Sequence, residues 1–402
     1  MTDRHDDVQA DRRRLLQWLG AGAAASTLTW SGKLFAAASN TDTRFLLVFL
    51  RGGYDANSLL VPVNSADYYS VRPNIAISKT DALALSNDWG LHPALKDSLY
   101  PLWQRSEIAF VPFAGTDDLT RSHFETQDSI ELGQPTSGHR NYQSGFMNRL
   151  AQQIQGVPAI SFTGTLPVCC TGPVNIPNVA LQDANRAPFD ERQSKLLAAM
   201  YDNHPLGAQV KEGLNLRQGV ARMLQDEMTA ANRGAVSTRG FEDQARRMGR
   251  LMREQYRLGF VDVGGWDTHV NQGNANGALA NNLNSLGKGL AAFAQESGEA
   301  WNKTVVVVVS EFGRTFRENG NKGTDHGHGS VYWVLGGGIH GGQIAGEQQE
   351  VSIPKLFQNR DWPVLNDYRA MLGGMFTHMY GFNSQQLEAV FPGVKPVDLK
   401  LV

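Results

Sequence analysis

Short runs of apolar residues recur along the chain and predict buried β-strands. Each run is rich in valine, leucine, isoleucine, alanine or phenylalanine, and most are bounded by glycine or polar residues. Runs of this length and composition are typical of strands that are covered on both faces, as in a parallel sheet. The predicted strands are 45–50, 108–113, 158–162, 258–263, 304–309 and 331–335.

The segments between these runs carry apolar residues at helical spacing, with charged residues on the opposite face, and therefore predict amphipathic helices. Strands that alternate with long helices favour a mainly parallel sheet covered by helices on both faces. We therefore predict an α/β fold with three layers, α/β/α. A helix-rich segment at about 170–257 is expected to form a cap or an insertion. The predicted helices are 189–201, 214–231, 241–256, 278–301 and 368–380.

Composition limits the classes of function. The chain has 402 residues, of which 41% are hydrophobic, enough for one large domain or two ordinary ones. A formal net charge of −2 removes the electrostatic attraction on which nucleic-acid binding depends, so we expect no nucleic-acid partner. The two cysteines, Cys169 and Cys170, are adjacent, which predicts no disulfide framework and excludes a thiolate metal site.

The amino terminus has the pattern of a twin-arginine export signal. Arg12 and Arg13 precede an apolar stretch at 19–30, which is shorter than the roughly 20 residues of a stable membrane span. Ala36-Ala37-Ala38 then forms a small-x-small cleavage site. We expect a signal peptide at 1–38, a mature domain at 39–402, passage through the twin-arginine machinery, and a periplasmic or secreted location without a stable membrane span.

Acidic residues and histidines follow or precede the predicted strands. Because ligand sites of open α/β sheets lie beyond the carboxyl ends of the strands, we expect these side chains to meet at one edge. Asp267 and His269 also lie two positions apart, so an extended backbone points both to the same side. The candidate metal ligands are Asp55, Asp267, His269, Glu311, Asp325 and His326.

Mixed carboxylate and imidazole ligands suit Zn²⁺ or Mn²⁺, and carboxylate-rich sites suit Mg²⁺ or Ca²⁺. We expect one or two such divalent ions per chain, and two ions together would clamp the attacking and leaving oxygens of a displacement. Simpler interpretations remain open for single residues. Asp55 fits a turn or a helix cap, and Glu311 fits an ion pair with Arg314 at the surface.

Ser122 has two compatible interpretations. Ser122 and Glu125 match the Ser-x-x-Glu capping box that begins a helix. A serine at a helix amino terminus is also well placed to act as a nucleophile, with Thr120 as the alternative. Arg51, Arg121 and Arg314 are candidates to bind an anionic substrate group, or are solvated surface charges.

Five motifs carry a family resemblance: Phe-Leu-Arg-Gly-Gly-Tyr-Asp55, Arg-Ser-His-Phe124, Gly-Trp-Asp-Thr-His269, Ser-Glu-Phe-Gly-Arg-Thr315 and Gly-Thr-Asp-His-Gly327. With these motifs in this order, the chain resembles the bacterial domain-of-unknown-function family fifteen-oh-one. That family is regarded as similar to the alkaline phosphatase/sulfatase superfamily, which implies the three-layer fold. By order, the resemblance places Asp55, Ser122, Asp267 with His269, Glu311, and His326 at the superfamily's functional positions.

The sequence departs from the superfamily pattern at two points. Asp267 and His269 are closer together than the corresponding pair usually is, and Glu311 replaces a common Asp-His pair. We predict an exported metal-dependent hydrolase of phosphate or sulfate esters, acting on a small-molecule or glycan ester. The alternative is a non-catalytic exported protein that retains the fold and binds a metal or a partner.

Overall fold

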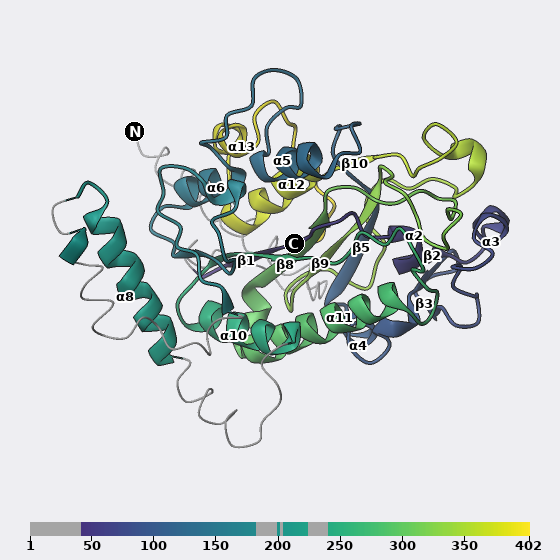
Figure 1. Ribbon diagram of the computed structural model, residues 1–402, viewed down its shortest axis with the longest axis horizontal. Coiled ribbons are helices and arrows are strands. Elements are labelled where there is room, and N and C mark those ends of the chain that lie inside the picture. Colours follow the sequence, from purple (N-terminus) through teal and green to yellow (C-terminus); the bar gives the residue numbers. More distant parts are fainter. Residues whose placement is uncertain (1–41, 182–198, 202–203, 224–239) are drawn as a thin grey trace, which may run out of the picture. The chain divides into compact units, whose positions relative to one another are not determined.

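A seven-stranded sheet forms the centre of the computed structural model, which describes residues 42–181, 199–201, 204–223 and 240–402 (Figure 1). The strand order is β10-β5-β9-β8-β1-β7-β6. Among the described strands of this sheet, β9 alone runs antiparallel to its neighbours. The strands are β1 (Arg44–Leu50), β5 (Ile108–Gly115), β6 (Ala159–Ser161), β7 (Leu258–Val263), β8 (Thr304–Ser310), β9 (Ser330–Leu335) and β10 (Asn366–Asp367).

All six predicted strands are present, and the predicted mainly parallel sheet is confirmed. The antiparallel direction of β9 has a consequence for the site. The amino-terminal end of β9 lies at the edge where the parallel strands have their carboxyl ends. Residues that precede β9 and residues that follow β1, β7 and β8 therefore lie at the same edge of the sheet.

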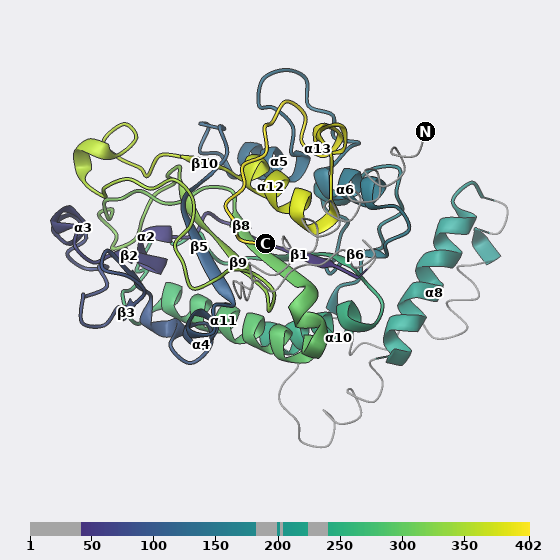
Figure 2. The ribbon, with the colours of Figure 1, turned by 180° about the vertical axis from the view of Figure 1, so that it is seen from behind.

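The side chains of β1 alternate between two apolar cores. Leu46, Val48 and Leu50 pack in the core that contains α10 (Phe241–Glu254) and α11 (Ala278–Ser297). The intervening residues of the strand pack on the opposite face, against four other helices (Figures 1 and 2). These are α5 (His123–Leu132), α6 (Phe146–Ile154), α12 (Tyr368–Tyr380) and α13 (Ser384–Val390).

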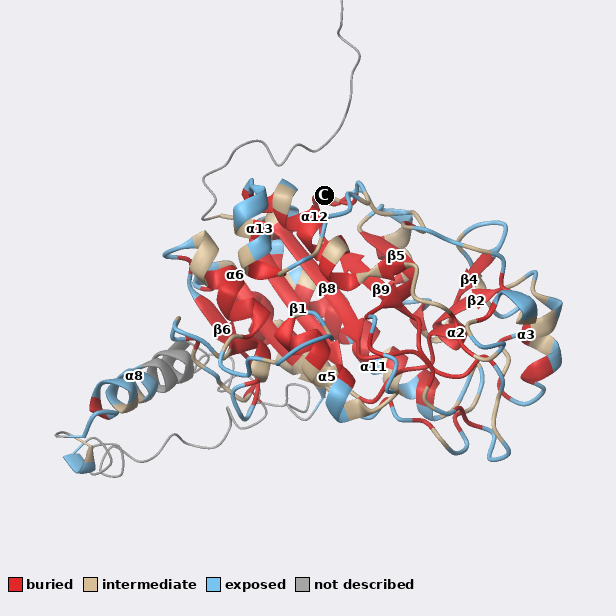
Figure 3. Cartoon of the chain, turned by 90° about the horizontal axis from the view of Figure 1, so that it is seen from above, coloured by how far each residue is buried: buried red, intermediate tan, exposed pale blue. Residues whose placement is uncertain are grey.

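Every residue of β1 is buried, as the predicted fully apolar strand requires, and Figure 3 shows the sheet as the buried middle layer. The three-layer α/β/α prediction is thereby confirmed. Cys169 and Cys170 are both buried and free, in agreement with the expected absence of a disulfide framework.

A small antiparallel sheet with short helices lies between β1 and β5 in the sequence, and the hydrophobic pattern does not predict it. Its strands have only two or three residues, too few to produce a periodic signal. The elements are α2 (Ala56–Leu59), β2 (Leu60–Pro62), α3 (Ala66–Val71), β3 (Leu83–Ala84), β4 (Trp89–Leu91), η1 (Pro93–Leu95) and α4 (Tyr100–Gln104). Further 3₁₀ turns are η2 (Val168–Cys170), η4 (Gly298–Lys303) and η5 (Ile353–Lys355).

The predicted helices at 241–256, 278–301 and 368–380 correspond to α10, α11 with η4, and α12. Part of the predicted 214–231 helix falls within α8 (Gly207–Met223), and 224–231 lies outside the described residues, as does most of 189–201. The predicted signal peptide at 1–38 also lies outside them. All described residues belong to one compact unit, Phe35–Val402, and none of their helices is long and apolar enough to cross a membrane.

Candidate metal centre

Three neighbouring strands of the sheet end at the same level. Leu50, the last residue of β1, lies opposite both Val263 of β7 and Ser310 of β8. The three loops that follow therefore begin side by side. This register brings together side chains that are far apart in the sequence.

Glycine permits the loops after β1 and β7 to touch. Gly52 has φ +122°, a conformation that L-residues rarely adopt, and a Cβ atom there would lie 2.8 Å from the backbone nitrogen of Asp267. A larger residue would push the two loops apart. Glycine at position 52 is therefore required for Asp267 to approach the neighbouring loop.

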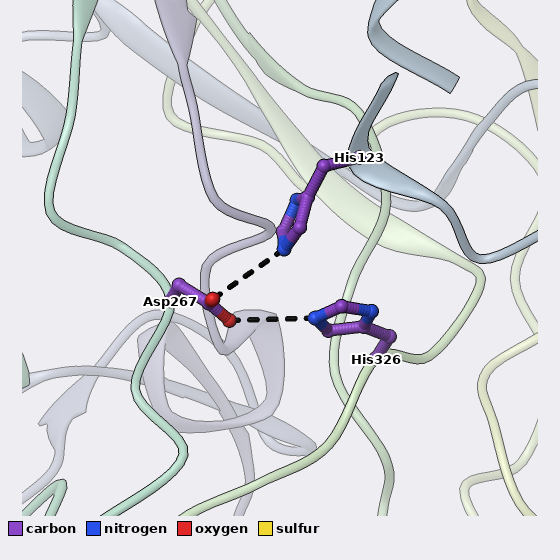
Figure 4. A group of neighbouring side chains, drawn as sticks. All are labelled: His123, Asp267 and His326. Atoms are coloured by element: carbon purple, nitrogen blue, oxygen red, sulfur yellow. Dashed lines mark ion pairs between the residues drawn. The ribbon is translucent and has the colours of Figure 1, made fainter. Parts of the chain in front are cut away.

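His123, Asp267 and His326 form a group of side chains that can hold a metal ion (Figure 4). His123 is the first residue of α5, Asp267 follows β7, and His326 precedes β9. The Nε2 atom of His123 lies 3.5 Å from Asp267 Oδ2, and Nε2 of His326 lies 3.4 Å from Asp267 Oδ1. The two imidazole rings are 4.2 Å apart between their centroids.

His269 adds a fourth donor atom on the same side. Its Nε2 lies 2.8 Å from Asp267 Oδ1 and 3.1 Å from Nε2 of His326. The structure thus places three imidazole nitrogens around one carboxylate. Of the predicted ligands, it brings Asp267, His269 and His326 together.

Each of the three imidazoles is held through its other nitrogen. Nδ1 of His123 lies 2.8 Å from Glu311 Oε1, and Nδ1 of His326 lies 2.9 Å from the carbonyl oxygen of Arg121. Nδ1 of His269 lies 3.3 Å from Asp325 Oδ1. All three partners are acceptors that suit an N–H at Nδ1, and in the neutral tautomer with its proton there the Nε2 lone pair faces the shared space. Metal-binding histidines are commonly oriented in this way.

A buried nitrogen atom without a hydrogen bond indicates whether a metal ion fits these residues. Nε2 of His123 is buried and has no hydrogen-bond partner, although buried polar atoms are normally satisfied. Ligand atoms about 2.1 Å from a tetrahedral Zn²⁺ stand roughly 3.4 Å apart. The separations of 2.8 to 3.5 Å around Asp267 surround that value. His123, Asp267 and His326 therefore fit a single divalent ion, with His269 beside them.

Arg314 fixes the position of the Asp267 carboxylate. Its side chain is fully buried and forms an ion pair with Asp267 Oδ1. The guanidinium also donates to the backbone oxygens of Gly52, Gly53 and Thr324. Burial alone would raise the pKa of Asp267, but the hydrogen bond and the charge of Arg314 outweigh it and lower that pKa. Arg314 thus acts within the protein and is not exposed to a substrate.

Glu311 is buried beneath His123. Its Oε1 accepts hydrogen bonds from His123 Nδ1, from the backbone N–H of Gly52 at 2.8 Å and from Gln127 Nε2 at 2.9 Å. Its Oε2 accepts from the Ser310 hydroxyl at 3.0 Å. Burial raises the pKa of Glu311, but the bonds from His123 and Gln127 outweigh this and lower it. The structure places Glu311 as the orienting partner of His123, and the surface ion pair with Arg314 is not found.

Asp55 lies in a separate buried cluster. It forms a two-pronged ion pair with Arg72 of the loop after α3, at 2.6 and 3.1 Å, and both side chains are fully buried. Ser58 and Gln272 each donate to Asp55 Oδ2 at 2.7 Å. Although burial raises the pKa of Asp55, the charge and hydrogen bonds of Arg72 lower it. The structure does not bring Asp55 into the His123–Asp267–His326 group.

The remaining predicted residues border the centre. The Asp325 carboxylate is about half exposed. Its Oδ1 atom pairs with Nδ1 of His269 and accepts a hydrogen bond from the side chain of Asn319. Arg51 forms ion pairs with Glu131 and Asp262.

Arg121 and Ser122 precede His123 at the start of α5. Arg121 has φ +54° and pairs with Asp361, while its carbonyl orients His326. The capping-box interpretation of Ser122 is wrong, because the Ser122 side chain makes no capping hydrogen bond. Glu125 instead pairs with Arg140.

His123 is the site residue that the sequence reasoning missed. It stands between Ser122, the candidate nucleophile, and Phe124 in the motif Arg-Ser-His-Phe124. The sequence feature that points to His123 is its position eight residues after the end of β5, at the same sheet edge as Asp267. A histidine at the start of a helix is common, and only the tertiary structure shows that its ring turns toward Asp267.

No curated protein matches the sequence. Solved structures that are similar to the chain include the lipoteichoic acid synthase LtaP from Listeria monocytogenes, with 9% identity, a TM-score of 0.39, and coverage of 90% of this chain and 76% of that chain. A protein in the alkaline phosphatase superfamily from Vibrio parahaemolyticus has 11% identity, a TM-score of 0.36, and coverage of 73% and 60%. Ps i-CgsB in complex with k-i-k-neocarrahexaose has 9% identity, a TM-score of 0.35, and coverage of 89% and 75%. Residues 42–391 match the family described as "Protein of unknown function (DUF1501)", and the chain therefore belongs to this family.

Proposed function

We propose that this protein is an exported metal-dependent hydrolase of phosphate or sulfate esters. The observation that carries the proposal is the convergence of three imidazole Nε2 atoms on the carboxylate of Asp267, with the Nε2 atom of His123 buried and without a hydrogen bond. Three imidazoles and one carboxylate favour Zn²⁺ or Mn²⁺ over Mg²⁺ and Ca²⁺, which prefer oxygen ligands.

One ion per chain fits the contacts better than two. A second ion would need the carboxylates of Asp55 and Glu311, as the sequence pattern suggested. Both are buried and committed to donors of the protein, Asp55 to Arg72 and Glu311 to His123. The buried guanidinium of Arg314 also supplies a fixed positive charge beside Asp267. We therefore infer a single-ion centre held by His123, Asp267, His269 and His326.

Ser122 remains the proposed nucleophile. It lies between Arg121, whose carbonyl holds His326, and His123, and its hydroxyl is not used as a helix cap. The hydroxyl oxygen would attack the phosphorus or sulfur atom, the alcohol would leave, and water would then release the phosphate or sulfate. A bound metal ion would withdraw charge from the ester oxygens and favour the ionised nucleophile.

The location and the substrate are parts of the same proposal. The twin-arginine pattern at Arg12 and Arg13 supports export to the periplasm or the medium. A protein in that compartment meets small-molecule and glycan esters. Export also argues against a phosphomutase or isomerase, since phosphorylated metabolites are mostly cytoplasmic.

Metal analysis and kinetics on the purified full chain test the proposal. We expect about one Zn²⁺ or Mn²⁺ per chain, and turnover of an aryl phosphate or an aryl sulfate that chelation abolishes and metal restores. Asp267→Asn should lose both the metal and the turnover. A chain that binds no divalent metal and cleaves neither ester after metal addition would refute the hydrolase assignment.

A further inference from the structure

A pocket of about 440 Å³ lies beside the candidate metal centre and has no role in the function proposed above. One wall is formed by the chain that follows Arg314, and the other by residues near η5. The lining carries four charged side chains, Arg317, Glu318, Asp325 and Arg360, together with the polar side chains of Thr315, Asn319 and Asn359.

Three of these side chains touch the histidines of the centre. Asp325 Oδ1 lies 3.3 Å from Nδ1 of His269, and Asn319 Nδ2 donates to the backbone oxygen of His269 at 3.0 Å. Arg360 Nη2 donates to the backbone oxygen of His326 at 2.8 Å. The pocket therefore borders the residues that hold His269 and His326 in place.

The charges of the pocket do not all have partners. Glu318, another lining residue, accepts from the backbone and side chain of Asn74, and Asp325 accepts from Asn319. Arg360 forms an ion pair with Asp361 at 2.9 Å.

The exposed guanidinium of Arg317 is different, because it has no hydrogen bond or ion pair within the described part of the chain. The side-chain amide of Asn359 on the opposite wall is also unpartnered there. Among the described lining residues, Arg317 is therefore a cation without an ion pair and Asn359 an amide without a hydrogen bond. The carboxylates of Glu318 and Asp325 accept from neutral amides, which leave their negative charges in place.

We propose that this pocket binds an anionic group of the substrate that is separate from the ester to be cleaved. A guanidinium is suited to a carboxylate, sulfate or phosphate through charge-assisted hydrogen bonds, and an amide in the same pocket can add a neutral donor. The inference rests on the proposed function for its link to catalysis. The substrate class becomes an ester with a second negative charge, such as an acidic glycan that carries a phosphate or sulfate ester.

Binding measurements separate this inference from the hydrolase assignment. The full chain is titrated calorimetrically with glucuronate, inorganic sulfate, inorganic phosphate and neutral glucose, both with metal and with a chelator. We expect at least one anion to bind more tightly than glucose, and to bind with the chelator present. The anion that binds most tightly identifies the group as carboxylate, sulfate or phosphate.

Arg317→Gln should weaken that binding roughly tenfold, since it removes a charged hydrogen-bond donor. Arg105→Gln is the matched control, because Arg105 is exposed and does not line the pocket. Equal anion binding by wild type and Arg317→Gln, binding only when metal is present, or no binding by any anion would overturn the inference. A chain that binds the anion but cleaves no ester would support anion binding by the pocket and refute only the hydrolase assignment.

For an active chain, the ratio of kcat/KM for a carboxyphenyl ester over the matching phenyl ester measures the link to catalysis. The ratio should fall roughly tenfold in Arg317→Gln through the KM of the carboxylated ester. An unchanged ratio would show that the pocket does not take part in substrate recognition.

Discussion

The Oδ1 atom of Asp267 lies 3.4 Å from Nε2 of His326, although the two residues belong to loops on different strands. Asp267 follows the parallel strand β7, and His326 precedes the antiparallel strand β9, so both loops reach the same sheet edge. The orientation of the surrounding groups then decides which side chains can bind an ion.

Glu311→Gln should weaken metal binding by about 10- to 100-fold, the usual effect of losing a carboxylate that orients a ligating histidine. The amide is a weaker acceptor for His123 Nδ1 and carries no charge to favour the correct ring orientation. Competition with a zinc-selective chelator measures the change. Glu125→Gln is the control, since Glu125 lies on the same helix as His123 and pairs with Arg140 at the surface. Equal metal affinity in the two variants would mean that Glu311 does not orient His123.

Asp55→Asn should destabilise the fold by about 3–5 kcal/mol, because it leaves the charge of Arg72 buried without its partner. Urea unfolding measures the loss, and the folded variant should still bind one metal ion per chain. Asp42→Asn, which breaks the exposed Asp42–Lys303 pair, should change stability little. A stable Asp55→Asn chain that had lost its metal would identify Asp55 as a ligand instead.

Ser122→Ala should lower kcat on the order of a thousandfold or more if Ser122 is the nucleophile. Stability should not change, because a side-chain cap is worth about 1 kcal/mol and Ser122 provides none. Thermal unfolding and single-turnover kinetics report the two quantities separately. A variant with wild-type kcat would exclude Ser122 from the chemistry, and attack by Thr120 or by water would then be the remaining routes.

His92 should make the fold less stable in acid. Its ring is buried, accepts a hydrogen bond from the backbone N–H of Ala94 and donates to the backbone oxygen of Asn274 at 3.0 Å. Burial lowers the pKa of His92 from 6.5 to about 4. Below pH 6.5, His92 therefore binds a proton in the unfolded chain but not in the folded chain. The free energy of unfolding falls as the pH is lowered from 6.5 to about 4.

The contribution of His92 over this range is roughly 3 kcal/mol. His92→Gln should lower stability at pH 7, because it loses the ring's contacts, but should show a shallower decline between pH 6.5 and 4. Urea unfolding across that range gives both quantities. Parallel declines in wild type and variant would show that His92 does not contribute to the acid sensitivity.

The amino-acid sequence was sufficient to predict the layers and the edge that carries the chemistry. The valine run of β8 and the apolar run of β1 can be buried on both faces only in the middle of a sheet, and both strands lie there. Asp267 and His269 were recognisable because they follow a predicted strand directly. Strong local patterns of this kind need no knowledge of distant residues.

The division of the acidic residues into ligands and structural partners was decided by the tertiary structure. Asp55, Asp267 and Glu311 all follow strands of one sheet, and the pattern treats them alike. Asp55 pairs with Arg72 of a short segment that the pattern did not predict, and Glu311 orients His123 from another helix. A buried carboxylate requires a donor or a cation beside it, and folding selects which one it receives. Asp267 remains partly exposed and faces three imidazoles, because burial and pairing depend on contacts between residues distant in the sequence.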